Sequence, residues 1–167
     1  TARLVRRGVK ALGLSGVDAG LLLADRLQQP AGDLGRVGEI RAVRAECLLE
    51  LIGLGYTPVI SPISLGFDGR PYNVNADHAA LAIARAVGAA EMIFLTDVPG
   101  VMREGRVLAS LAVDAVNTMI AEGVITGGMI PKVESALMAL EYGIGAAHIT
   151  NLAGLAAGNG TRVVARA

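Results

Sequence analysis

The sequence predicts an α/β fold of three layers, an α-β-α sandwich in which helices cover both faces of a mostly parallel sheet. Short apolar runs alternate along the chain with segments whose apolar residues recur every three or four positions, which is typical of strands joined by helices. A hydrophobic fraction of 53% provides material for a large buried core. The 22 glycines exceed what a plain helical bundle uses and indicate many tight turns. At 167 residues, the chain has the length of about one domain.

The first half of the chain contains four apolar runs of strand length and two segments with helical spacing. We expect strands at 9–14, 21–26, 36–40 and 57–61, and helices at 41–54 and 77–87. The first helix has a single apolar stripe and ends at Gly55, and the second is rich in alanine and ends at Gly88. Pro30 and Asp33 predict a loop at 28–35, and the Asp-Gly pair predicts a turn at 67–70.

The second half continues the alternation. We expect strands at 92–95, 147–150 and 162–165, and helices at 111–122 and 133–141. The run at 92–95 is apolar without interruption, as in a parallel sheet that is covered on both faces.

Composition excludes several classes of function. Fifteen basic residues balance fifteen acidic ones, aromatic residues make up 3% and tryptophan is absent, so we expect no nucleic-acid partner. No run of about 18 uncharged apolar residues occurs, so we expect no membrane span. Cys47 is the only cysteine, which we expect on a buried helix face, and the chain fits a reducing, cytoplasmic compartment. No cysteine or histidine has metal-ligand spacing, so we assign no protein-bound metal.

Ligands of open α/β sheets bind where strands end and helices begin, and three polar segments fall in such places. The first contains Asn73, Asn75 and Asp77, directly before the alanine-rich helix. Asn75 or Asp77 alone would suffice as the helix cap. Two carboxamides and one carboxylate at alternate positions are more than a cap needs, and they indicate a binding function as well.

The other two segments lie farther along the chain. Thr96 and Asp97 follow the strand at 92–95 and could offer a hydroxyl and a carboxylate to a nucleotide, although solvated polar residues of a turn would look the same. Gly127-Gly128 precedes a helix whose first turn contains Pro131 and Lys132. A cation is unfavourable at this positive end of a helix, so Lys132 indicates a compensating anion such as a transferring phosphoryl group. The alternative is a solvated lysine beside a flexible loop.

Taken together, five motifs occur in an order that resembles a known family. They are Gly-Leu-Ser-Gly-Val-Asp at 13–18, Asp-Leu-Gly-Arg-Val-Gly-Glu-Ile at 33–40, Asn-Val-Asn-Ala-Asp at 73–77, Leu-Thr-Asp-Val-Pro-Gly-Val at 95–101 and Gly-Gly-Met-Ile-Pro-Lys-Val at 127–133. From about residue 9 to its end, the chain resembles the acetylglutamate kinases of the amino acid kinase family. The resemblance implies the carbamate kinase-like fold, with residues 1–167 forming the C-terminal, nucleotide-binding part of the domain and the N-terminal part absent.

The resemblance also implies a reaction and roles for the residues. ATP, with Mg²⁺ held mainly by its phosphates, would phosphorylate the γ-carboxylate of N-acetyl-L-glutamate in arginine biosynthesis. By similarity, Lys132 would stabilise the charge of the transferring group and Asp77 would orient the catalytic lysines. Asn73 and Asn75 would help to bind acetylglutamate. The nucleotide would contact Thr96, Asp97, Gly128 and Met129.

The chain departs from the family pattern in ways that leave alternatives open. The family's Lys-x-Gly-Gly segment and His-Gly-Gly-Gly loop, which hold the phosphates, are absent from these 167 residues, so we expect the chain alone to be inactive. A sister kinase of lysine biosynthesis, acting on an acylated aminoadipate, is one alternative, and a non-catalytic nucleotide-binding module is another. The resemblance further implies a homo-oligomer, either a dimer or a hexamer of dimers. Regulation by arginine or by a PII-type protein would fit the family, and Gly-Asn-Gly-Thr at 158–161 belongs to the region involved.

Overall fold

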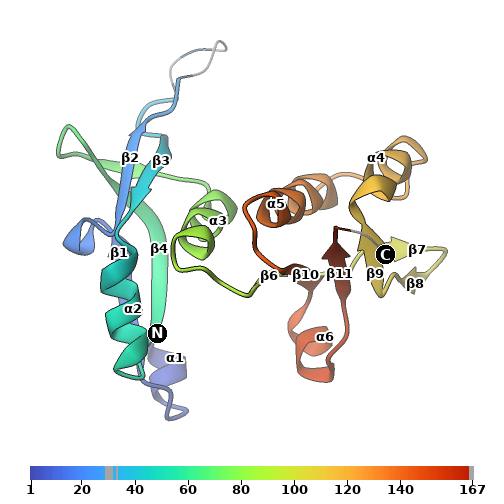
Figure 1. Ribbon diagram of the computed structural model, residues 1–167, viewed down its shortest axis with the longest axis horizontal. Helices are drawn as coiled ribbons and strands as arrows, with labels where there is room; N and C mark the ends of the chain where they lie inside the picture. Colours follow the sequence, from blue (N-terminus) through green and yellow to red (C-terminus); the bar gives the residue numbers. More distant parts are fainter. Residues whose placement is uncertain (29–31, 33, 166–167) are drawn as a thin grey trace. The chain divides into compact units, whose positions relative to one another are not determined.

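The computed structural model describes residues 1–28, 32 and 34–165, which form two compact units, Thr1–Val87 and Gly88–Ala167. Half of the predicted loop at 28–35, including Pro30 and Asp33, lies outside the described residues. Each unit has its own sheet and its own helices (Figure 1).

The first unit is built on a five-stranded sheet with parallel strands at its centre. Its strands are β1 (Ala11–Gly16), β2 (Leu22–Arg26), β3 (Gly38–Val43), β4 (Thr57–Gly66) and β5 (Pro71–Asn73), and its helices are α1 (Ala2–Val5), the short 3₁₀ helix η1 (Asp18–Gly20), α2 (Ala45–Gly53) and α3 (Ala76–Ala86). The long strand β4 pairs in parallel with both β1 and β2, whereas β3 joins β2 and β5 joins β4 in antiparallel fashion. The Asp-Gly turn predicted at 67–70 is confirmed, because it connects the antiparallel strands β4 and β5.

The pairing of β1 with β4 is interrupted at a proline. Ser15 pairs with Ser61, but the next partners are Gly16 and Ser64, so the register shifts around Pro62. Pro62 has no N–H to donate, and its carbonyl accepts instead from the Val74 N–H at 3.2 Å. Gly16 is required at the shift, because a Cβ there would lie 2.7 Å from the Ile63 carbonyl oxygen.

The second unit is built on a four-stranded sheet in the order β6-β10-β11-β9, with a separate two-stranded hairpin. Its strands are β6 (Glu91–Leu95), β7 (Met102–Arg103), β8 (Arg106–Val107), β9 (Ser110–Ala112), β10 (Ala146–Thr150) and β11 (Thr161–Val164), and its helices are α4 (Val113–Ala121), α5 (Met129–Glu141) and α6 (Leu152–Ala157). β6 is parallel to β10, and β9 is parallel to β11. Helix α5 packs on β6, β10 and β11 through small buried residues such as Ala136 and Ala139.

The predicted α/β class with mostly parallel strands is confirmed, and hydrogen bonding divides the strands among separate sheets. The expected helix at 41–54 is wrong at its start, since residues 41–43 form the end of β3, where Ala42 and Val43 pair with β2. The helix at 111–122 also begins later, because Leu111 and Ala112 pair with β11. Strands β5, β7, β8 and β9, the 3₁₀ helix η1 and helix α6 were not predicted. No helix among the described residues is both long enough and apolar enough to cross a membrane.

The core of the first unit gathers side chains from strands and helices. Leu21, Leu22, Leu48 and Val74 are almost completely buried in one cluster, which α3 joins through Ala79. Cys47, the neighbour of Leu48 on α2, is only half-buried and free.

Replacing Leu22 should therefore destabilise the first unit. Leu22 has no exposed surface, so Leu22→Ala leaves a cavity and should lower the free energy of unfolding by about 2–5 kcal/mol. The matched control is Leu54→Ala, because Leu54 is 68% exposed. Urea denaturation of both variants measures the difference, and equal losses would contradict this description of the core.

Candidate functional site

The first polar segment lies where β5 ends and α3 begins. Asn73 pairs with Ile63 of β4, and its N–H also donates to the Arg36 carbonyl at 2.8 Å. Val74 follows with its side chain buried, which anchors the segment in the core. The flanking Asn73 and Asn75 therefore remain exposed, and Asp77 is half-buried in the first turn of α3.

The structure decides which residue caps α3. The Asn75 Oδ1 atom accepts from the N–H groups of Asp77 at 2.9 Å and of His78 at 3.2 Å. Asn75 is thus the helix cap, and its carboxamide NH₂ remains as the donor that it could offer to a substrate. The Asp77 carboxylate is not needed for capping, and its backbone is fixed by the Asn75 side chain.

The second polar segment extends the parallel pairing of β6 and β10. The Thr96 N–H donates to the Thr150 carbonyl at 2.9 Å, one residue beyond the end of β6. The Thr96 hydroxyl then donates to the Asp97 carboxylate at 3.0 Å. Asp97 is exposed and Thr96 is half-buried, so a hydroxyl and a carboxylate stand together at the carboxyl edge of the sheet.

The third polar segment is the start of α5. Gly127 has a left-handed φ of 54°, Gly128 is the N-cap, and no atom lies within 4 Å of a Cβ built on either glycine. The backbone is therefore open to a ligand at the positive end of a helix of 13 residues. Pro131 lies in the first turn as predicted, and Met129 and Lys132 are half-buried.

The predicted site residues thus fall into two groups. Asn73, Asn75 and Asp77 come together in the first unit, at one helix start. The predicted nucleotide contacts and Lys132 belong to the second unit, on α5 and on the segment after β6.

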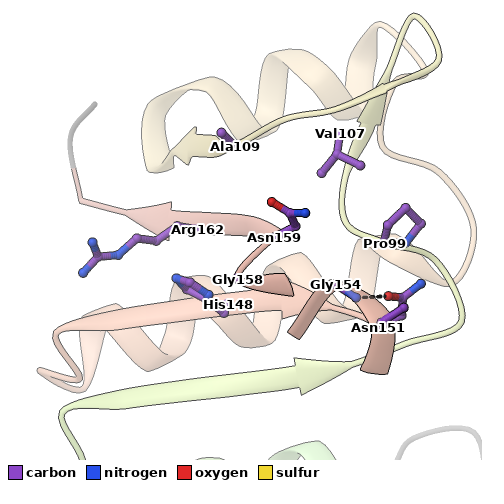
Figure 2. A pocket seen from close by; sticks show the side chains of 11 residues that line it. Pro99, Val107, Ala109, His148, Asn151, Gly154, Gly158, Asn159 and Arg162 are labelled. Carbon is purple, nitrogen blue, oxygen red and sulfur yellow. Dashed lines mark hydrogen bonds between the residues drawn. The ribbon is translucent and has the colours of Figure 1, made fainter. Parts of the chain in front are cut away.

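The second unit also contains a cavity that the sequence analysis did not predict. The cavity has a volume of about 680 Å³ and is lined by residues from the segment after β6, from β10 and from the α6–β11 loop (Figure 2). Asn151 lies at its wall and caps α6 by accepting from the Gly154 N–H at 2.7 Å. His148 also lines the cavity, and its Nε2 atom lies 3.3 Å from a Glu91 carboxylate oxygen. The glycines at 158 and 160, which belong to a motif already noted in the sequence, were the signal for this loop.

Two exposed carboxylates in the first unit organise turns. The Ser15 N–H and hydroxyl donate to Asp18, at 2.6 and 2.9 Å, and this lowers the pKa of the Asp18 carboxyl below its ordinary value. The Arg70 N–H lowers the pKa of Asp68 in the same way, and the hydrogen bond from Tyr72 to Asp68 raises the pKa of the Tyr72 hydroxyl. The Asp18 turn gives a structural reason for the motif at 13–18.

Metal ligation has no evident protein site in the part of the chain that the structure describes. No group of three histidine, cysteine, aspartate or glutamate side chains there could hold a metal ion.

Comparisons with known proteins agree on a family. The sequence profile of the amino acid kinase family matches residues 1–151. The acetylglutamate kinase of Roseiflexus castenholzii is 54% identical over 164 residues, which cover 98% of this chain and 62% of that protein. The acetylglutamate kinase of Methanopyrus kandleri is 46% identical, and the aligned region covers 69% of it. The chain therefore spans about three fifths of the length of its first curated relatives.

Solved structures support the fold. The structure of smu.665 from Streptococcus mutans has a TM-score of 0.82 at 30% identity, covering 98% of this chain and 64% of that one. Carbamate kinase from Giardia lamblia bound to AMP-PNP has a TM-score of 0.66 at 17% identity, with coverage of 98% and 65%. The second similarity concerns the fold alone.

The capping role of Asn75 predicts a specific pattern of stability. Asn75→Ala removes the acceptor for two N–H groups and should cost about 1 kcal/mol of the free energy of unfolding, whereas Asn75→Asp keeps an acceptor and should cost much less. Chemical denaturation measures both variants. Equal stability of Asn75→Ala and the wild type would show that the cap is not formed in solution.

Proposed function

This chain belongs to the amino acid kinase family, and from that premise we propose that the protein containing it phosphorylates N-acetyl-L-glutamate with ATP. The γ-phosphoryl group would pass to the γ-carboxylate, giving N-acetylglutamyl 5-phosphate and ADP in arginine biosynthesis. The relatives named acetylglutamate kinase, at 46–54% identity, support the choice of substrate. The single observation that best supports phosphoryl transfer is the open glycine pair with Lys132 at the start of α5.

The proposed reaction requires alignment of the substrate carboxylate with the γ-phosphoryl group and no proton transfer. A carboxylate is ionised at pH 7 and attacks the γ-phosphorus directly, so no general base is required. One P–O bond forms to the carboxylate oxygen while the bond to the ADP oxygen breaks, and ADP leaves with that electron pair. Catalysis then depends on alignment of the reactants and on neutralising the charge that spreads over the phosphoryl oxygens.

The start of α5 fits the transferring group. The N–H groups of Gly127 and Gly128 have no hydrogen-bond partner among the described residues, and the helix end carries a partial positive charge. Lys132 adds a full positive charge in the same turn. We assign to Lys132 the stabilisation of the phosphoryl group, and to Gly128 and Met129 contacts along the nucleotide.

The remaining predicted residues fit supporting roles. Thr96 and Asp97 form a hydroxyl–carboxylate pair that suits the hydroxyl groups of a ribose. Asn73 has an exposed carboxamide for the acetylglutamate, and Asn75 retains an NH₂ donor. Asp77 would orient lysines through its carboxylate. Mg²⁺, held chiefly by the nucleotide phosphates, would supply further neutralisation of their charge.

Substrate length is the point that most needs a direct test. An acylated aminoadipate is one methylene longer than acetylglutamate, and one methylene changes binding by only about 1–3 kcal/mol. Hydroxylamine trapping of the acyl phosphate, with the full-length protein and each substrate in turn, separates the two. We expect a higher kcat/KM for N-acetyl-L-glutamate. A higher value for the acylated aminoadipate would assign the protein to the sister reaction, and no acyl phosphate from either would contradict the proposed activity.

Lys132→Ala should lower turnover far more than it weakens ATP binding. The lysine charge matters most to the phosphoryl group in the transition state, so kcat should fall by about 100-fold or more. Lys10→Ala is the matched control, since Lys10 is an exposed lysine at the start of the chain. Steady-state kinetics compare the variants, and a kcat near the wild-type value for Lys132→Ala would remove Lys132 from the mechanism.

Asp77→Asn should impair turnover while leaving the fold nearly unchanged. Asn75 supplies the cap and is unchanged in the variant, and the loss of one carboxylate at the positive end of α3 should cost about 0.3–1 kcal/mol through the helix dipole. Asp114→Asn is the matched control, because Asp114 also lies in the first turn of a helix, α4. We expect similar melting temperatures for both variants and a reduced kcat for Asp77→Asn alone. Unchanged kcat in Asp77→Asn would leave Asp77 with no part in the reaction.

A further inference from the structure

A buried hydroxyl joins two parts of the second unit that are far apart in sequence. Thr161, the first residue of β11, has no exposed surface. Its Oγ1 atom accepts from the Val101 N–H at 2.8 Å and donates to the Leu108 carbonyl at 2.7 Å. One side-chain atom thus satisfies a backbone donor and a backbone acceptor that lie 60 and 53 residues before it.

The two bonds fix the base of the β7–β8 hairpin. Val101 and Leu108 flank that hairpin, and the Leu108 N–H also donates to the Val101 carbonyl at 2.9 Å. Thr161 therefore holds both ends of the hairpin to the four-stranded sheet, to which β11 belongs. A valine of the same shape could do neither, because it has no hydroxyl, and it would leave the N–H of the buried Val101 and the carbonyl of the half-buried Leu108 without this partner.

The same hydroxyl limits the position of the segment after β6. A Cβ on Gly100 would lie 2.7 Å from the Thr161 Oγ1 atom and 2.8 Å from a Val107 methyl group, so the Gly100 backbone lies directly against both side chains. At its other end the segment is held by the bond from Thr96 to the Thr150 carbonyl. The five residues from Thr96 to Gly100 are thus fixed on one side by β10 and on the other by Thr161.

We infer that Thr161 is a positioning residue for nucleotide binding, acting through the segment that carries Thr96 and Asp97. The inference rests on the proposed function, because it takes that segment as part of the ATP site. Thr161 would act without touching the nucleotide. It keeps Val101 and Gly100 in place, and the hydroxyl–carboxylate pair of Thr96 and Asp97 keeps its direction as a result.

The test compares three variants of the full-length protein by steady-state kinetics and by calorimetric titration with ATP. Thr161→Val removes the hydroxyl, and Thr161→Ser keeps it. Thr150→Val is the matched control, since it removes an equally buried hydroxyl that bonds to the Asn159 carbonyl at 2.7 Å and leaves the backbone bond to Thr96 intact. Thr161→Val should raise KM and Kd for ATP about tenfold, the effect of roughly one net hydrogen bond, with KM for acetylglutamate changed less than about twofold. Thr161→Ser should restore the ATP values.

The outcomes separate this inference from the proposed function. A wild-type protein that does not bind ATP contradicts the proposed function and this inference with it. ATP affinity unchanged in folded Thr161→Val, or lowered equally in Thr150→Val, contradicts the positioning role while the function stands. Should Thr161→Val fail to fold, Gly100→Ala tests the same contact, because its Cβ pushes against the Thr161 hydroxyl at a positive φ of 153°. Unchanged ATP affinity in Gly100→Ala would then overturn the inference.

Discussion

The parallel pairing of β6 with β10, continued by the hydrogen bond from Thr96 to Thr150, determines where polar groups can stand in the second unit. Parallel strands end at the same edge of their sheet, so the residues after both strands emerge side by side. After β6 these are Thr96 and Asp97, and after β10 comes Asn151, which turns at once into α6. This edge of the sheet therefore carries hydroxyl, carboxylate and carboxamide groups at the ends of two paired strands. The roles proposed for Thr96 and Asp97 depend on that position.

The N-termini of helices α3 and α5 also determine how each unit can bind a ligand, and the two helices differ in how their backbone N–H groups are satisfied. At α3 the helix N–H groups are satisfied from within, by the Asn75 side chain. At α5 a glycine takes the cap position and offers no side chain, and the N–H groups of Met129 and Ile130 donate to the Thr126 and Gly127 carbonyls instead. The N–H groups of Gly127 and Gly128, just before the helix, stay open among the described residues, and a lysine follows in the first turn. The first arrangement fixes a carboxylate in space, and the second suits an incoming anion. This contrast is the physical basis for assigning orientation to Asp77 and charge stabilisation to Lys132.

Sequence patterns predicted most strands and helices because the apolar runs are short and clearly spaced, as at 92–95 and 147–150. They were wrong where one apolar stretch serves two elements, since Leu111 suits a strand and a helix equally and only its pairing with β11 decides. The three helix-start and strand-end segments were found from local chemistry. The role inferred for Thr161 could not be found that way, because its partners lie 60 and 53 residues away and a threonine in a strand looks ordinary in sequence. The choice between Asn75 and Asp77 as the cap likewise required the hydrogen bonds.

A crystal structure of the full-length protein with a non-hydrolysable ATP analogue and N-acetyl-L-glutamate would test these roles most directly. We expect the γ-phosphoryl group at the start of α5, with the Lys132 Nζ atom within hydrogen-bond distance of it and the ribose beside Thr96 and Asp97. We also expect the γ-carboxylate of the substrate in line with that phosphoryl group. A nucleotide bound instead in the cavity lined by His148 and Asn151, or phosphates remote from Lys132, would contradict these roles.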